Sequence, residues 1–187
     1  MLRVRSGFAA LAAVIGLVAI GVIGTLAVLP LVETIAEQDR VEQTHEFLVN
    51  LTDAPQQGLQ KFLADVGRPP GQMTHLSQEI TGTDLSLCGT SYGNGRAGNW
   101  QPVSNRIFVA TGVPTRLGII RNTLVHITGA QEYLAMEIAD VLLEDAQRMD
   151  VIVDNPTGAT TGRVRWITSD ATQALVTLRW LVPITKC

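Results

Sequence analysis

The sequence predicts an α+β fold in which a long N-terminal α-helix, kinked near Pro30, packs on a C-terminal antiparallel β-sheet head. Three observations lead to this prediction. Residues 8–32 carry no charged side chain, residues 33–66 space their apolar side chains as one face of a helix does, and beyond about residue 106 the apolar period falls to two. The expected segments are 1–7, a leader; 8–32, an apolar helix; 33–66, an amphipathic helix; 67–105, a connecting loop region; and 106–187, the sheet with a short helix near 143–153.

The uncharged segment 8–32 is long enough to cross a membrane. As a helix it would measure about 37 Å, more than a hydrocarbon core of about 30 Å. Arg3 and Arg5 precede it, and Glu33 is the first charge after it, so the positive-inside rule predicts a cytoplasmic N-terminus and an extracytoplasmic remainder. Pro30 would remove a hydrogen bond near the end of this helix and kink it.

The amphipathic pattern continues the predicted helix beyond the membrane. Charged residues alternate with an apolar stripe from Leu31 to about Leu51, and four apolar residues follow at the spacing i, i+3, i+4 and i+7. They predict a helical segment that continues or restarts after Pro55 and runs to about Val66. These four are Leu59, Phe62, Leu63 and Val66. Gly67, followed two residues later by a proline, is expected to end the helix.

The remainder of the chain predicts antiparallel strands around one short helix. The helix is Leu143 to Val153, with two acidic residues in its first turn, where they suit the helix dipole. A turn over 155–158 then leads to a hairpin-like end that contains Trp166 and Trp180. The expected strands are Ile107–Ala110, Leu117–Ile120, Leu124–Thr128, Tyr133–Ile138, Arg163–Thr168 and Ala174–Val182.

Charge and cysteine usage agree with an exported domain. The chain has 14 basic and 17 acidic residues, a net charge of −3, and no visible basic patch, so nucleic acid is not predicted as a partner. Cys88 and Cys187 are its two cysteines, and in an oxidising compartment a lone pair favours a disulfide over two free thiols.

At its N-terminal end the chain resembles the type IV pilin-like proteins, which include type IV pilins and the pseudopilins of type II secretion. The residues that carry the resemblance are a short basic leader ending in Gly7, a hydrophobic Phe8 after it, and a long apolar segment with Pro30 near its end. A second match is the stretch from Leu59 through Asp65 to Pro70, which is similar to the helix end of major pseudopilins.

The resemblance implies a structural subunit. A prepilin peptidase would cut after Gly7 and methylate Phe8, and assembly machinery would then move subunits from the inner membrane into an extracytoplasmic helical homopolymer. Apolar helices leaving lipid can keep their surface dry by packing on one another, and small residues permit close approach. The expected filament-core positions are Phe8, Ala9, Ala12, Ala13, Gly16, Ile20, Gly21, Gly24 and Pro30.

Two positions depart from the family pattern. A glutamate is usual at the fifth residue of the mature chain, where it can neutralise the terminal amine of a neighbouring subunit, but here that residue is Ala12. Pro30 is one position later than usual. The alternatives are a minor or tip subunit, a filament in which another group meets the amine, and a leader that is not processed.

The search for catalytic or metal chemistry predicts neither an enzyme nor a cofactor. His45, His75 and His126 have no metal-ligand spacing, and the glycine-rich run from Cys88 to Gly95 lacks a phosphate-loop lysine and predicts a surface loop with an Asn94-Gly95 turn. Five acidic residues lie close in sequence, but an acidic helix face explains them as well as a calcium loop would. They are Asp140, Glu144, Asp145, Asp150 and Asp154.

Two other interpretations of the first segment compete with a filament subunit. One is a membrane anchor for an extracytoplasmic binding or enzyme domain that does not polymerise. The other is a cleavable secretory signal, for which Thr25 to Ala27 offers small residues, although the apolar run is longer than a usual signal core.

Overall fold

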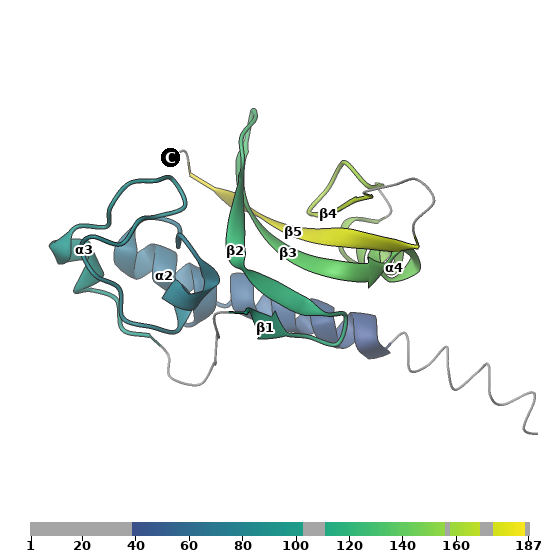
Figure 1. The fold of residues 1–187 in the computed structure, drawn as a ribbon, viewed down its shortest axis with the longest axis horizontal. Helices are drawn as coiled ribbons and strands as arrows, with labels where there is room; N and C mark the ends of the chain where they lie inside the picture. Colours follow the sequence, from purple (N-terminus) through teal and green to yellow (C-terminus); the bar gives the residue numbers. More distant parts are fainter. Residues whose placement is uncertain (1–38, 103–110, 156–157, 169–173, 186–187) are drawn as a thin grey trace, which may run out of the picture. The chain divides into compact units, whose positions relative to one another are not determined.

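The computed structural model describes residues 39–102, 111–155, 158–168 and 174–185. The chain divides into two compact units, Met1–Asp39 and Arg40–Cys187, and the architecture below is that of the second unit. Its centre is a five-stranded antiparallel sheet in the order β1-β2-β3-β5-β4 (Figure 1). The strands are β1 Val113–Pro114, β2 Ile119–Ile127, β3 Glu132–Leu142, β4 Val164–Ile167 and β5 Leu175–Ile184.

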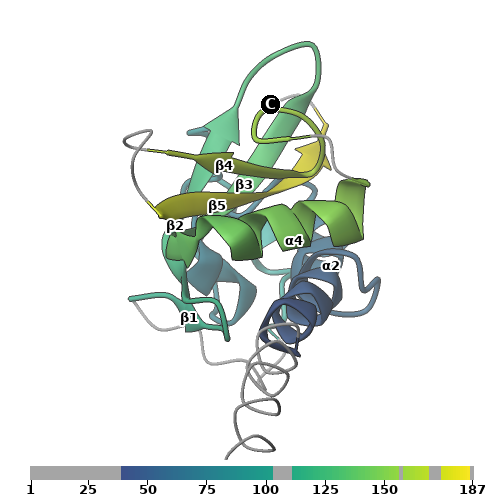
Figure 2. The ribbon, with the colours of Figure 1, turned by 90° about the vertical axis from the view of Figure 1, so that its right-hand side faces the viewer.

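Short helices surround this sheet. An α-helix reaches residue 52 from residue 39, where the described chain begins, and the others are α2 Gly58–Val66, the 3₁₀-helix η1 Met73–Leu76, α3 Asn94–Ala97 and α4 Leu143–Asp154. In Figure 2, α4 runs alongside β5. The predicted helix from Leu143 is confirmed, with Glu144 and Asp145 in its first turn.

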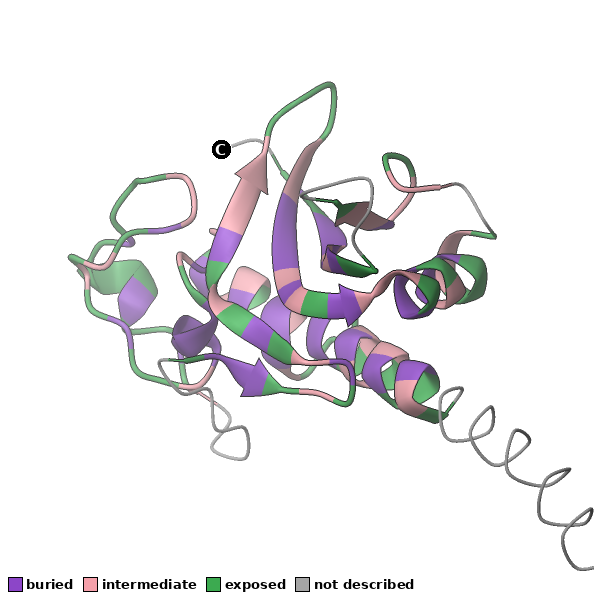
Figure 3. Ribbon diagram, turned by 45° about the vertical axis from the view of Figure 1, so that its right-hand side comes forward, coloured by how far each residue is buried: buried purple, intermediate pink, exposed green. Residues whose placement is uncertain are grey.

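One face of the sheet is the core face. On β5 the alternate residues Val176, Leu178 and Trp180 are buried, and they pair with buried residues of β3 such as Met136. The burial colours in Figure 3 alternate along the strands accordingly. The ring of His45, on the helix over 39–52, lies 5.9 Å from the ring of Trp180, so this helix covers the core face.

The strands β4 and β5 confirm the predicted pairing of 163–168 with 174–182. The two short strands expected over 117–128 form one strand, β2, whose pairing register with β3 shifts between Ile120 and Leu124. A second shift lies in β3 between Ile138 and Val141, where Asp140 has a φ of +57°. The strand expected over 107–110 lies outside the described residues.

The predicted fold class is wrong in its helical half. Residues 33–66 were expected to be helical, with the segment after Pro55 either continuing or restarting; in the described part of the chain the helix ends at residue 52 and α2 restarts at Gly58. Pro55 explains the break, because a proline inside a helix removes a backbone donor and its ring clashes with the preceding turn. The four α-helices of the described residues are short, and none is a long apolar helix. Residues 8–32 and the expected kink at Pro30 lie outside the described residues.

No helix within the described ranges is both long and apolar enough to cross a bilayer.

The glycine-rich run from Cys88 to Gly95 was expected to be a surface loop, but this run and the residues after it contribute to the core. Tyr92 and Trp100 are buried, and their rings meet the ring of Phe62 edge-on at 5.8 and 4.8 Å. Asn94 and Gly95 begin α3 and do not form the predicted turn. Burial of two large aromatic side chains against α2 stabilises this conformation by more than the turn preference of Asn-Gly would stabilise a turn.

Gly58 is expected to tolerate no side chain. Its φ is +61°, and a Cβ there would lie 2.2 Å from the carbonyl oxygen of Leu51. We expect Gly58→Ala to lower the free energy of unfolding by about 3 kcal/mol, from backbone strain together with forced separation of α2 from the preceding helix. Urea unfolding followed by tryptophan fluorescence measures this change.

Gly89→Ala is the matched control for this variant. Gly89 has a similar φ of +72°, but nothing lies within 4 Å of its added Cβ, so the control carries the backbone strain alone. An equal loss of stability in the two variants would show that contact with Leu51 contributes nothing.

Candidate functional site

The face of the sheet opposite the helices carries a row of charged residues that crosses four strands. Arg121 lies on β2, Glu137 on β3, Arg179 on β5 and Arg165 on β4. These four residues are called the arginine row below. The register places Glu137 opposite Arg179 and Arg179 opposite Arg165, so the side chains share a face by the alternation of a β-strand. The row has three positive charges and one negative charge.

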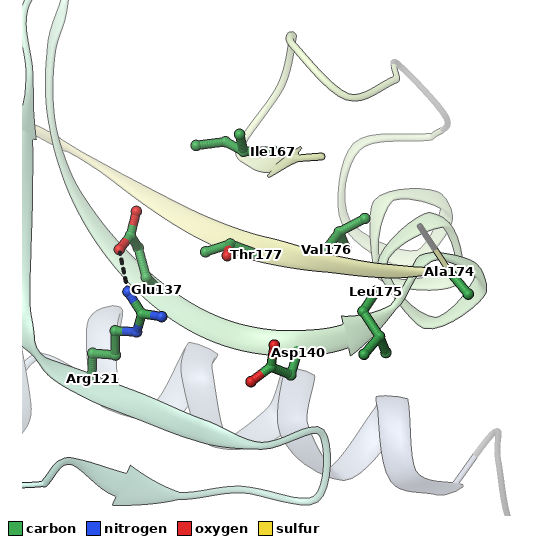
Figure 4. A pocket seen from close by; sticks show the side chains of 8 residues that line it. All are labelled: Arg121, Glu137, Asp140, Ile167, Ala174, Leu175, Val176 and Thr177. Carbon is green, nitrogen blue, oxygen red and sulfur yellow. Dashed lines mark ion pairs between the residues drawn. The ribbon is translucent and has the colours of Figure 1, made fainter. Parts of the chain in front are cut away.

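Glu137 is the anionic centre of the row. Arg179 donates to its carboxylate from Nε at 2.9 Å and from a terminal guanidinium nitrogen at 2.8 Å. The guanidinium of Arg121 lies 3.8 Å from the other carboxylate oxygen (Figure 4). One carboxylate is therefore shared by two guanidinium groups, and the charge-assisted bonds from Arg179 hold it in place.

Arg165 stands apart from that carboxylate. Its Nε donates to the carbonyl oxygen of Gly162 at 3.1 Å, and its guanidinium lies 5.6 Å from the centre of the Tyr133 ring. On the adjacent strand its direct partner is Arg179, another cation. Like charges directly opposite on neighbouring strands destabilise a sheet, so this pairing costs the isolated fold stability.

A groove runs beside the row. Its polar side includes Arg121, Glu137 and Asp140, and its apolar side includes Ile167 and Leu175, which are 44% and 42% exposed. Figure 4 shows these side chains along β2, β3 and β5 and at the end of β4. Guanidinium groups bind carboxylates and phosphates through parallel hydrogen bonds, so Arg165 and Arg179, which lie outside the lining of this groove, offer anion binding, and the groove beside them offers aliphatic contact.

Two ion pairs, one with a buried carboxylate and one partly exposed, join the helix over 39–52 and the residue after it to the rest of the unit. Arg40 donates to Asp145 of α4 at 2.8 Å, and the Asp145 side chain is only 3% exposed. Arg163 donates to Asp53 at 2.6 and 2.9 Å and lies 4.4 Å from the centre of the Trp180 ring. The hydrogen bond from Arg163 lowers the pKa of Asp53. Both pairs fix the helix over 39–52 on the core face.

A buried His75–Tyr92 contact fixes the loop between α2 and α3. The Tyr92 hydroxyl donates to the carbonyl oxygen of Pro69 at 3.2 Å, accepts from the amide of Gly71 at 2.9 Å and lies 3.1 Å from Nδ1 of His75. Burial raises the pKa of Tyr92 to about 12 and lowers the pKa of His75, against a smaller opposing effect of Asp84. Both side chains are therefore held neutral at pH 7.

The folded protein is expected to lose stability as the pH falls below about 6.5. His75 in the unfolded chain takes up a proton near its ordinary pKa of 6.5, whereas in the folded chain it does so only at lower pH. Between these two values the unfolded state binds more protons than the folded state does. The free energy of unfolding therefore decreases as the pH decreases. Urea unfolding at pH 7.5 and at pH 5 measures the slope, and an NMR titration of the His75 ring measures the pKa directly. A ring pKa at or above 6.5 would contradict this expectation.

The predicted processing and filament-core residues lie outside the described residues, from Gly7 to Pro30. Cys88 is disulfide-bonded, while Cys187, the other cysteine of the sequence, is outside the described residues. The acidic residues considered for calcium are dispersed: Asp140 is exposed on the sheet, and Asp145 is buried against Arg40. Among the described residues, no group of three or more acidic, histidine or cysteine side chains could hold a metal ion.

The sequence interpretation did not identify the arginine row. The predicted pairing of 163–168 with 174–182 already contained Arg165 and Arg179, each at a period-two position. Their partnership depends on the register, which the pattern left open.

Comparison with known proteins found no matching family model, no matching curated protein and no matching solved structure.

Proposed function

We propose that this chain is a structural subunit, a pilin or pseudopilin, that polymerises through its apolar segment 8–32 into an extracytoplasmic filament. The observation that carries the proposal is the order of the sequence: a basic leader ending in Gly7, 25 uncharged residues from Phe8, and then an exported acidic domain. The described unit suits a filament head, because a helix entering from the N-terminal side covers an antiparallel sheet.

The proposed partners follow from this role. A prepilin peptidase would act at Gly7 and Phe8, the inner membrane would hold the subunit before assembly, and other copies of the chain would surround it afterwards. The filament would lie outside the cytoplasm or at the cell surface. The role is structural, without catalysis or a cofactor, and the disulfide of Cys88 would brace the head in an oxidising compartment.

N-terminal mass analysis of the exported protein tests the proposal, together with electron microscopy of shed surface material. Cleavage after Gly7 with a methylated Phe8, in preparations that contain filaments, is the expected result. Cleavage after Ala27 would overturn it in favour of a secretory signal. A membrane-bound protein with intact Met1 that forms no filaments would favour an anchored binding domain, for which the arginine row is the candidate surface.

A further inference from the structure

We propose that the folded heads of neighbouring copies of this chain contact each other through unlike surfaces. The acidic side of the helix over 39–52 on one copy would bind to the arginine row of the next. This inference rests on the proposed filament and adds the contact that joins its heads. The carboxylates it assigns are those of Glu42 and Glu46.

The charges of the arginine row favour binding of a carboxylate from another molecule. Within the fold, Arg179 and Arg121 share Glu137, while Arg165 faces Arg179 and has a carbonyl oxygen and an aromatic ring as its neighbours. A carboxylate placed between Arg165 and Arg179 would offset their repulsion. The folded unit alone leaves that repulsion in place.

The helix over 39–52 offers carboxylates at a suitable spacing. Glu42 and Glu46 are exposed and lie one helical turn apart, about 6 Å along the axis. Arg165 and Arg179 lie on adjacent strands, about 5 Å apart at the backbone. Arg116 also contacts this helix, where its Nε donates to Oε1 of Gln43 at 3.1 Å. Two carboxylates can thus meet two guanidinium groups.

The two surfaces belong to opposite layers of one head. His45, on the same helix, contacts Trp180 on the core face, whereas Arg165 and Arg179 point from the other face of the sheet. A copy therefore cannot close this contact on itself, and each copy presents both halves. Such a contact between unlike surfaces repeats from copy to copy, which produces a ring or an open filament and not a closed two-fold dimer.

The groove beside the row adds apolar contact. Ile167 and Leu175, both exposed, flank the charged residues and would be covered by the stems of the glutamate side chains and by the helix that carries them. The charges would set register and partner choice, while the aliphatic contact would contribute burial.

Cysteine crosslinking in the full-length chain tests this contact. Asn50→Cys lies one turn beyond Glu46 on the exposed side of the helix, and Ile167→Cys lies beside the arginine row. In the double variant, held in membranes or in mild detergent, a short bis-maleimide is expected to give a ladder of dimers, trimers and larger species. The matched control pairs Ile167→Cys with Gln147→Cys, an exposed position on α4, and is expected to give no ladder.

Charge reversal identifies the residues responsible. In the crosslinking background, Arg165→Glu is expected to lower the ladder yield at least about tenfold, and Glu46→Arg to do the same. The two reversals combined in one chain are expected to restore it, which a merely misfolded head would not do. An unchanged ladder in the single variants, or no rescue in the combined one, would overturn the assigned residues.

The outcome separates this contact from the proposed function. Filaments without the ladder would overturn the docking mode and leave the filament role in place. A charge-dependent ladder from a protein that forms no filaments would support the docking mode and overturn the filament role. Absence of both would overturn both.

Discussion

Under the proposed function, replacing Gly16 with arginine is expected to abolish filament assembly while the head, residues 40–187, remains folded. The substitution places a charge in the middle of the uncharged segment 8–32. A charge at the centre of a membrane helix costs about 2.5–3.5 kcal/mol on insertion scales, and the same side chain would be buried again among packed copies. Electron microscopy measures filament number, and the intact disulfide of Cys88, read by mass analysis, reports the head.

Gly16→Ala is the control, because it keeps the segment apolar and the side chain small. It is expected to leave filament number near that of the natural chain, and Ile20→Arg is expected to reproduce the loss. Filaments of normal dimensions built from the Gly16→Arg protein would rule out a filament core made of residues 8–32.

The elements that could be predicted from the sequence are those fixed by local pattern. The position of α4 followed from its apolar spacing and first-turn acids, and the end of α2 at Val66 followed from Gly67, whose φ of +69° only glycine adopts readily. The hairpin of β4 and β5 followed from period-two runs. In each case neighbouring residues alone decide the conformation.

The predictions from sequence were wrong where contacts between residues far apart in the chain determine the local structure. The apolar stripe fitted either a continuous or a restarted helix across Pro55, and it does not show that the chain turns there and restarts at Gly58. Tyr92 and Trp100 lie in a stretch with loop composition, and their burial depends on Phe62, which precedes them by 30 and 38 residues in the chain. Composition alone could not show that partnership.

The sequence shows the individual charged residues of the candidate site but not their arrangement. Each member of the arginine row is visible in the sequence as an isolated charge, and none forms a motif with another. The row exists because β5 lies between β3 and β4, so Arg179 has Glu137 on one side and Arg165 on the other. Strand order and register are global properties of the sheet, which a local pattern does not encode.

Removing the charge of Arg40 is expected to destabilise the head strongly. Its partner Asp145 has a side chain only 3% exposed, and the ion pair joins the helix over 39–52 to α4. Arg40→Met would leave that carboxylate buried without its cation, and breaking a buried pair from one side costs about 3 kcal/mol. Urea unfolding of the full-length protein in mild detergent, followed by tryptophan fluorescence, measures the loss.

The double variant Arg40→Met/Asp145→Leu distinguishes a buried charge from lost packing. Arg40 Nε and Asp145 Oδ1 are both buried without a hydrogen-bond partner, so the pair is incompletely satisfied as it stands. Replacing both residues removes the desolvated charges together, and the double variant is expected to recover most of the stability that Arg40→Met loses. A double variant as unstable as Arg40→Met, or less stable, would show that the ion pair contributes more than its desolvation costs. In that case this ion pair, together with Arg163–Asp53, would help to position the helix face that carries Glu42 and Glu46.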